Sequence, residues 1–450
     1  MCIVGSCRIP SCSDSSSSRR TPGTVRTDIK PANIDQIVDA VRGALAEQQP
    51  LEIVGRGTKR NLGRPIQAGA TLDLSALSGI VTYEPAELIL TCLAGTQLAE
   101  IEAALAAKNQ QLAFEPGDWG PLYGAAAGQG TIGGVLACNL SGPRRLKAGA
   151  ARDHFLGVSA VSGRGEIFKA GGKVVKNVTG YDLPKLLCGS YGTLAVMAEV
   201  TLKVLPAPEK SRTVLLFGLD DDRAIAAMSA ALNSPHEVAS AAHLPARIAA
   251  RTGIDLVTKP GTAVTAIRIE GPGPSVDHRC AALRRELGAR IATEELHSMR
   301  SSMFWRTARD VAPLLPDPRA PLWRLSVPPA AGAKVVKDIV ERLPSPRRGE
   351  GTGGEGEAAR AAIDYFYDWA GGLIWLTLSP RSDAGAAIIR AAIASNGGGH
   401  ATLMRASDDV RLAVPVFEPQ AEPLALLTAR VKDSFDPQRI LNPGRMAGSI

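Results

Sequence analysis

Apolar residues recur at helical spacing in the segment 31–49, where Pro31 suits a first helical turn. The positions that share one face of this predicted helix are Ile34, Ile37, Val38, Val41 and Leu45. The apolar run LEIV at 51–54 follows, and such a short run is typical of a buried strand. The pattern therefore predicts a helix followed by a strand at the start of the first domain.

Short strands then alternate with turns. The segments 71–77, 79–85 and 87–95 each fit a short strand, and 111–117 is strand-like. Between them, Thr96 is a candidate cap for a helix with apolar residues at helical spacing. Those apolar residues are Leu98, Ile101 and Leu105. Helices mixed with hairpin-like strands predict an α+β domain.

Further along, the pattern predicts a hairpin, a helix and a long strand. The hairpin spans 156–172 and turns at Gly163–Gly165; a short helix follows at 183–192, where Asp182 is a good N-cap. The strand at 194–206 ends at Pro206. Because PAPEK then breaks the pattern, we expect a domain boundary there.

A second α+β domain is expected after this boundary, from alternating apolar segments. Its predicted strands are 213–219, 263–271, 321–329 and 372–379, and its predicted helices are 225–232, 280–287 and 384–394. The expected organisation is a disordered tail (1–26), a first domain (27–206), a second domain (207–430) with a disordered insertion (344–357), and a C-terminal segment (431–450) that returns to the first domain.

Composition narrows the class of protein. The 450 residues are 45% hydrophobic, enough for a large core in more than one domain. The net charge is +7, but the basic residues are spread along the chain and mixed with acidic ones, and aromatic residues make up only 4%. This composition disfavours nucleic-acid binding. There is no run of eighteen apolar residues, and the N-terminus lacks the apolar core of a secretory signal. We expect a cytoplasmic protein.

The seven cysteines predict neither disulfides nor a metal site. Three lie in the Ser-rich tail, and four are scattered singly through apolar or small-residue segments. They are Cys2, Cys7 and Cys12 in the tail, and Cys92, Cys138, Cys188 and Cys280 in the body of the chain. An odd total without CxxC or a Cys/His cluster is typical of thiols in a reducing compartment.

Two glycine-rich loops suggest the chemistry. GRGTKRNLG (55–63) follows a strand, and GQGTIGGVLACNLSG (128–142) threads apolar residues through glycines. Without a Cβ, a ligand can approach backbone N–H groups, and successive N–H groups form a seat for a diphosphate. Neither loop is a Walker A sequence, and the GxGxxG at 128–133 lacks the preceding strand of a Rossmann turn. Glycines that serve only tight turns remain the alternative.

The order of four motifs resembles a known family. VGRGTKRNLG, PGD…GQGTIGGVLACNLSGPRRLKAGAARDHFLGV, KNVTGYDLPKLLCGSYGTLAVMAEVTLKVLP and the terminal FDPQRILNPGRM are similar to vanillyl-alcohol-oxidase-type (PCMH-type) FAD-binding proteins. Within them, the chain most resembles the E subunits of bacterial glycolate oxidase (glycolate dehydrogenase). The resemblance implies a two-subdomain PCMH-type FAD-binding module followed by a second α+β domain, the FAD-linked oxidase C-terminal (cap) domain.

The resemblance also implies which residues hold FAD. The first loop lines the pyrophosphate, the second forms a wall along the pyrophosphate and ribityl chain, a third segment contacts the ribose and adenine end, and one asparagine returns to the flavin side. In that order they are Gly55, Arg56, Gly57, Thr58 and Lys59; Pro116, Gly130, Thr131, Gly133, Gly134, Asn139, Ser141 and Gly142; Gly192, Thr193 and Val196; and Asn442. No histidine lies in the first loop, so the FAD is expected to be non-covalent.

The catalytic machinery is less clear from the sequence. Oxidation of a 2-hydroxy acid needs a base and a cation for the carboxylate. The six histidines are not paired at metal-ligand spacing, and no metal is expected. His400, after three glycines, is the candidate base, with a surface loop as the alternative; Arg324, on a predicted strand, is the candidate cation, with an exposed strand residue as the alternative.

The functional expectation is an FAD-binding subunit of a glycolate dehydrogenase complex that oxidises glycolate to glyoxylate. The resemblance implies two partners, a catalytic D-like flavoprotein and an iron–sulfur F-like subunit, through which the complex associates with the inner face of the cytoplasmic membrane. Two alternatives stay open: an autonomous FAD-dependent 2-hydroxy-acid oxidoreductase, and an assembly subunit whose flavin fold is empty.

Overall fold

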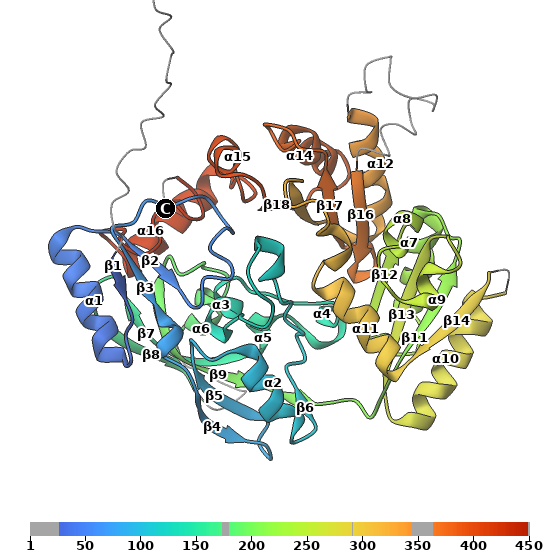
Figure 1. The fold of residues 1–450 in the computed structure, drawn as a ribbon, viewed down its shortest axis with the longest axis horizontal. Coiled ribbons are helices and arrows are strands. Elements are labelled where there is room, and N and C mark those ends of the chain that lie inside the picture. The colour runs from blue at the N-terminus through green and yellow to red at the C-terminus, as the bar shows by residue number, and fades with distance from the viewer. Residues whose placement is uncertain (1–26, 173–179, 290, 344–362, 449–450) are drawn as a thin grey trace, which may run out of the picture.

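The computed structural model describes residues 27–172, 180–289, 291–343 and 363–448. Figure 1 shows two parts side by side: an N-terminal domain built on β1 to β10, and a cap domain built on one large sheet, β11 to β18. Both mix helices and strands, so the predicted α+β class is confirmed. The predicted tail (1–26) and insertion (344–357) lie outside the described residues.

The first subdomain is a small parallel sheet in the order β1-β3-β2. Its elements are β1 (Thr27–Ile29), β2 (Leu51–Val54), β3 (Ala70–Asp73) and α1 (Ile34–Glu47). The helix predicted from the apolar spacing is confirmed, and it buries Ile37, Val38, Val41 and Ala44. Its N-cap is Asn33, so Pro31 precedes the helix and does not lie in its first turn.

The second subdomain is a five-stranded antiparallel sheet in the order β4-β5-β9-β7-β8. Its strands are β4 (Ile80–Glu84), β5 (Ile89–Leu93), β7 (Phe155–Ser162), β8 (Ile167–Gly171) and β9 (Ala195–Lys203). Its helices are α2 (Leu98–Ala106), α3 (Ile132–Ala137), α4 (Arg145–Ala148), α5 (Ala151–His154) and α6 (Leu183–Leu187). The predicted hairpin β7–β8 is confirmed, as is Asp182 as the N-cap of α6.

Two local predictions in this subdomain are wrong. Helix α2 has Gln97 at its N-cap position, and the Thr96 hydroxyl is engaged elsewhere. Its oxygen accepts from Gly79 N at 2.9 Å, and it donates to the carbonyls of Gly79 and Leu93. The segment 111–117 is not a strand. Only Gln110–Gln111 pairs as β6, with β10 (Leu205–Pro206).

The cap domain is an eight-stranded antiparallel sheet in the order β14-β11-β13-β12-β16-β17-β15-β18. Its strands are β11 (Lys210–Phe217), β12 (Ser240–Leu244), β13 (Val264–Gly271), β14 (Thr293–His297), β15 (Leu322–Ser326), β16 (Ile363–Asp368), β17 (Leu373–Leu378) and β18 (His400–Arg405). Its principal helices are α7 (Asp221–Leu232), α10 (Gly273–Leu287), α11 (Ser298–Arg309), α12 (Gly332–Arg342) and α14 (Ala386–Ser395). The predicted strands β11, β13, β15 and β17 are confirmed; β12, β14, β16 and β18 were missed.

The two faces of this sheet serve different cores. Along β16, Tyr367 packs into the core of the cap with α7, α12 and α14, whereas its neighbour Phe366 belongs to a core that continues into the N-terminal domain. Because side chains alternate along a strand, every second residue of β15 to β18 is directed to the N-terminal domain. This face is therefore placed to complete a site between the two domains.

The chain end returns to the N-terminal domain through α15 (Asp408–Ala413) and α16 (Glu422–Phe435). In α16, Lys432 is fully buried; its Nζ donates to Asp436 Oδ2 at 2.6 Å and to the carbonyl of Thr193 at 2.6 Å. Leu441 then bridges to Leu51 beside β2. The buried ion pair of Lys432 and Asp436, with its further hydrogen bonds to backbone carbonyls, fixes how the chain end packs on the N-terminal domain.

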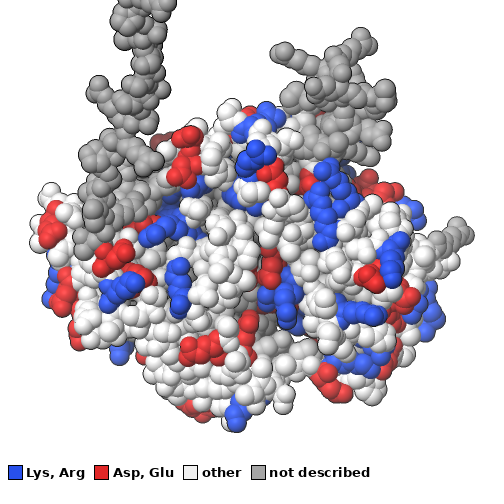
Figure 2. All heavy atoms as spheres, viewed as in Figure 1, with Lys and Arg blue, Asp and Glu red and all other residues white. Residues whose placement is uncertain are grey.

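On the face shown in Figure 2, basic and acidic side chains are interspersed among neutral atoms. Within the described residues, no helix combines the length and apolar character needed to cross a bilayer.

Candidate functional site

The first wall of the site is the loop that follows β2. Its carbonyls are held by arginines from the chain end: Arg445 Nη1 donates to Arg60 O at 2.7 Å and Leu62 O at 3.0 Å, and Arg411 Nη1 donates to Asn61 O and Gly63 O, both at 2.7 Å. In the described part of the chain, the backbone N–H groups of residues 56–59 have no protein acceptor. Free N–H groups in a turn are the donors that a diphosphate requires.

The second wall is α3 and the turn before it. Thr131 caps this helix by accepting from Gly134 N at 3.3 Å. The two walls meet at Gly55, where a Cβ would collide with the Thr131 side chain. A Cβ on Gly133 would lie 2.7 Å from the carbonyl oxygen of Ala94, so this glycine is required by the approach of two backbones.

Lys59 supplies positive charge between the walls. Its Nζ lies 3.3 Å from Thr58 Oγ1, and within the described residues it forms no ion pair. The pKa of Lys59 is lowered, because the effect of burial exceeds the opposing effects of Cys138 and Asp118. Burial also raises the pKa of the Cys138 thiol to about 11, so the thiol is protonated near neutral pH. The cleft thus offers one unpaired ammonium to an anionic ligand.

The third wall combines the Tyr191–Gly192 turn with the chain end. Asn442 accepts from Ile53 N at 2.9 Å and donates to Tyr191 O at 2.8 Å, so its amide joins β2 to this turn. Gly192 has φ +69°, and a Cβ there would lie 2.8 Å from the Asn442 amide nitrogen. Asn442 therefore acts by holding two walls together.

The structure brings many of the expected cofactor residues into one cleft. Those that line it are Gly55, Arg56, Gly57, Thr58, Lys59, Thr131, Gly133, Gly134, Gly192 and Asn442. Others support its walls from outside: Ser141 Oγ accepts from Ala151 N, Asn139 Oδ1 accepts from Arg152 N, and Gly142 approaches the carbonyl of Glu115. Val196 is buried in β9, Thr193 is buried in the bend just before that strand, and Pro116 and Gly130 lie in irregular segments before the second wall.

Across from this cleft lies the cap face that carries Arg324. Arg324 pairs in register with Trp375 and Thr402, so these three side chains share the face directed to the N-terminal domain. His400, two residues before Thr402, shares that face but lies exposed at the start of the edge strand β18. His400, the candidate base, thus lies at a strand end and not in the surface loop that was its alternative, and its side chain is more exposed than that of Arg324.

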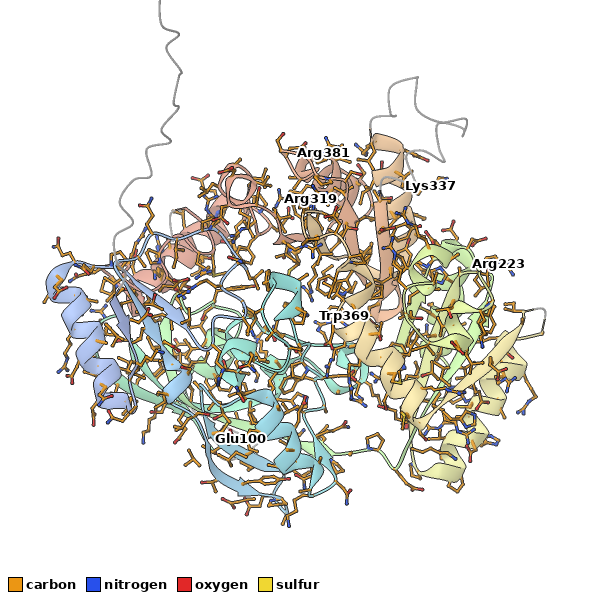
Figure 3. The ribbon with its side chains drawn as sticks, viewed as in Figure 1. Glu100, Arg223, Arg319, Lys337, Trp369 and Arg381 are labelled. Carbon is orange, nitrogen blue, oxygen red and sulfur yellow. The ribbon has the colours of Figure 1, made fainter. Side chains whose placement is uncertain are left out.

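Sequence reasoning missed several residues at this junction. Asp368 ends β16, a strand that was not predicted, and Trp369 follows it. Three more lie within the motifs GSYGTLA, GPRR and LNPGRM: Tyr191, Arg145 and Arg445. Figure 3 places Trp369 between the two domains. Burial raises the pKa of the Asp368 carboxyl to about 7, although its Oδ1 accepts from Trp369 N at 2.7 Å.

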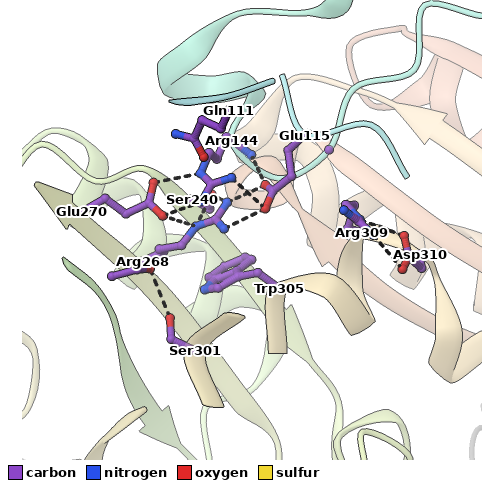
Figure 4. A network of polar contacts seen from close by, with 12 residues as sticks. Gln111, Glu115, Arg144, Ser240, Arg268, Glu270, Ser301, Trp305, Arg309 and Asp310 are labelled. Carbon is purple, nitrogen blue, oxygen red and sulfur yellow. Dashed lines mark hydrogen bonds and ion pairs between the residues drawn. The ribbon is translucent and has the colours of Figure 1, made fainter. Parts of the chain in front are cut away.

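A buried ion network fixes the two domains against each other (Figure 4). Arg268 of β13 donates to both carboxylate oxygens of Glu115, at 3.0 and 2.7 Å, and Arg144 bridges Glu115 to Glu270. Burial alone would raise the pKa of both carboxyls, but the guanidiniums outweigh it. The pKa of Glu115 therefore lies below its usual range and that of Glu270 at about 2.

Comparison with known proteins identifies the family. The family model "FAD binding domain" matches residues 26–171. The glycolate oxidase subunit GlcE of Escherichia coli (strain K12) is 35% identical over 415 residues, which cover 92% of this chain and 97% of that protein. The chain belongs to the GlcE family of FAD-linked oxidoreductases.

Other relatives match less than half of this GlcE-family chain. Glycolate oxidase subunit GlcD of Bacillus subtilis (strain 168) is 31% identical over 45% of this chain and 41% of its own length. The D-lactate dehydrogenase of Archaeoglobus fulgidus is 32% identical over 40% and 38%. Among solved structures, 4-ethylphenol oxidase from Gulosibacter chungangensis superposes with a TM-score of 0.66 at 15% identity, over 93% of this chain and 88% of that one, which shows the shared fold.

The cofactor of this GlcE-family oxidoreductase is FAD. The cleft fits it: free N–H groups and Lys59 suit the diphosphate, and the glycines leave the walls open to its approach. The predicted family, cofactor and enzyme class are therefore confirmed.

Proposed function

We propose that this chain is the FAD-binding subunit of a glycolate dehydrogenase complex, which oxidises glycolate to glyoxylate and passes electrons to an iron–sulfur partner. The observation that carries the proposal is the match to GlcE over nearly the full length of both proteins. The partners are a D-like flavoprotein and an F-like iron–sulfur subunit, and the complex is cytoplasmic, held at the inner membrane face through its partners.

The residues have distinct roles in this proposal. Lys59 and the N–H groups of the first loop offset the diphosphate charge, and the FAD is held non-covalently: no histidine lines the cleft described above, and the Cys138 thiol is protonated. FAD, when bound, supplies the two-electron chemistry that side chains lack. Arg324 offers a cation to the substrate carboxylate, and His400, on the same sheet face, is the candidate base.

A tagged pull-down from the native cell tests the proposal. The eluate is expected to contain the two partners, to show a flavin spectrum and to reduce a dye with glycolate. The chain purified alone is expected to be yellow and to reduce the dye weakly or not at all. Full activity of the chain alone would favour an autonomous oxidoreductase, and an inactive eluate with all subunits present would refute the proposal.

The two candidate catalytic residues are tested in the same complex. Arg324→Met is expected to raise KM for glycolate, and His400→Gln to lower kcat with little change in KM. Arg223→Gln, at an exposed position on α7, is the matched control. If His400→Gln retains the control's kcat, another residue is the base.

A further inference from the structure

Two arginines from different domains lie against one tryptophan at the domain junction. The Cζ of Arg145, in α4 of the N-terminal domain, is 4.4 Å from the ring centroid of Trp369, and the Cζ of Arg324, in β15 of the cap, is 5.1 Å from it. The indole is fixed because its Nε1 donates to the carbonyl of Gly142 at 3.1 Å. Both guanidiniums are thus held in place by stacking, which leaves their N–H groups available.

Neither arginine has an acidic partner within the described residues. No ion pair or side-chain hydrogen bond joins either guanidinium to a carboxylate there, and Asp368, the carboxyl that acts on Arg324, has its pKa raised to about 7. The pKa of Arg324 is lowered, chiefly by burial and further by the charge of Arg145. Like charges held close together cost free energy, and an anion bound between them offsets that cost.

The pair adjoins the cofactor cleft. Tyr191 lines that cleft, and it is close enough to Arg324 for each to affect the other's pKa. An anion held by the arginines therefore lies beside the wall that Tyr191 forms.

We propose that Arg145 and Arg324 together form a seat for the carboxylate of a small 2-hydroxy acid, with Trp369 as the rigid support of both. Guanidinium groups bind carboxylates through paired hydrogen bonds, whose planar geometry a lysine cannot reproduce. Because each domain contributes one arginine, the seat is complete only when the ion network of Glu115 and Arg268 holds the domains together. This inference rests on the proposed function, since it names how that substrate class is recognised.

The test is calorimetric titration of the FAD-loaded chain with oxalate, a carboxylate that is not oxidised. Oxalate is expected to bind the wild type, and Arg145→Met and Arg324→Lys are each expected to weaken binding by roughly 10- to 100-fold. Arg145 is exposed, so its replacement leaves the core intact, and Arg223→Met on the distant α7 is the matched control. The neutral glycolamide is expected not to bind.

Three results would overturn the proposal: no oxalate binding by the wild type, equal binding by both variants and the control, or sulfate bound as tightly as oxalate, which would indicate an unspecific anion site. The outcome is separable from that of the proposed function. A complex that oxidises glycolate with an unchanged KM in Arg145→Met and Arg324→Met would refute the seat and keep the function. If oxalate binding depends on the two arginines but the complex oxidises no 2-hydroxy acid, the proposed function is refuted and the carboxylate seat is kept.

Discussion

The two sides of the domain junction are built by opposite means. On the N-terminal side, the cleft is lined by backbone N–H groups, by glycines such as Gly55 and Gly134, and by the single ammonium of Lys59. On the cap side, large charged and aromatic side chains face the junction: Arg324 and Trp375 from the sheet and Trp369 from the turn after β16. A diphosphate needs several N–H donors converging at short range, which main chain supplies, whereas the carboxylate of a small substrate is recognised by charged side chains.

The difference also separates the energetics of the two sides. Replacing a glycine in the cleft forces backbones apart, because Gly133 already lies against the carbonyl of Ala94. Replacing Arg268 of the ion network leaves the backbone packing unchanged but removes a partner of the buried Glu115 carboxylate. Variants at a cleft glycine and at an ion-network side chain therefore test separately how the main chain and how the side chains build the junction.

The largest effect on cofactor binding is expected for Gly133→Val. Its Cβ would lie 2.7 Å from the Ala94 carbonyl oxygen, so the second wall must move, and we expect complete loss of bound flavin with about 1–3 kcal/mol of destabilisation. Gly172→Ala, where a Cβ would meet nothing within 4 Å, is the control. The measurement is the ratio of flavin to protein absorbance; a fully yellow Gly133→Val would refute the main-chain wall.

The next effect is expected at the ion network. Arg268→Met strands Glu115 with Arg144 as its sole partner in a buried site, and a broken buried pair costs about 3–5 kcal/mol of unfolding free energy. Denaturant unfolding measures it, and Arg268→Met combined with Glu115→Gln should recover part of the loss. The ion pair of Arg342 and Asp338 near the surface is the comparison: Arg342→Met should cost much less unfolding free energy than Arg268→Met. If Arg268→Met and Arg342→Met lose equal unfolding free energy, burial does not determine the cost.

The same contrast explains what the sequence allowed us to predict. Helix α1, hairpin β7–β8 and the loops around Gly57 and Thr131 are set by local spacing and glycine positions, which are visible in the chain. The junction was not predictable in the same way. Arg145 and Trp369 are more than two hundred positions apart in the sequence, and they meet because β16, an unpredicted strand, pairs between β12 and β17.

The hydrogen bonds of Thr96 make the same point on a smaller scale. Its position favours an N-cap, but its hydroxyl donates to Gly79, a residue seventeen positions earlier that the sheet brings close. Local preference is overridden wherever a tertiary partner competes for the same group.

A smaller effect is expected for Lys59→Met, which removes the cleft's ammonium without adding bulk. A charge-assisted hydrogen bond contributes about 1.5–3 kcal/mol, so the Kd for FAD should rise roughly 10- to 100-fold while the fold stays intact. Titration of the apoprotein with FAD, followed by fluorescence, measures the change. Lys108→Met, at an exposed position after α2, is the matched control, and an unchanged Kd for Lys59→Met would show that backbone donors alone hold the diphosphate.

The most gradual effect concerns the pH dependence of stability on the cap side, where Asp368 differs from the carboxylates of the ion network. The pKa of Asp368 in the folded state is raised to about 7, above the usual value of about 3.9. Between these pH values the folded state binds more protons than the unfolded state. Its stability therefore falls as pH rises, by at most about 1.4 kcal/mol per pH unit. Glu270, with a pKa lowered to about 2, has the opposite sign: its stabilisation is present above about pH 4.3 and is lost as pH falls toward 2. Asp368→Asn should therefore remove the decline between about pH 4 and 7 and leave the loss in acid unchanged, as measured by unfolding at a series of pH values. Asp409→Asn, at an exposed position in α15, should leave both intact, and a profile for Asp368→Asn parallel to the wild type would show that this carboxyl is already ionised below neutral pH.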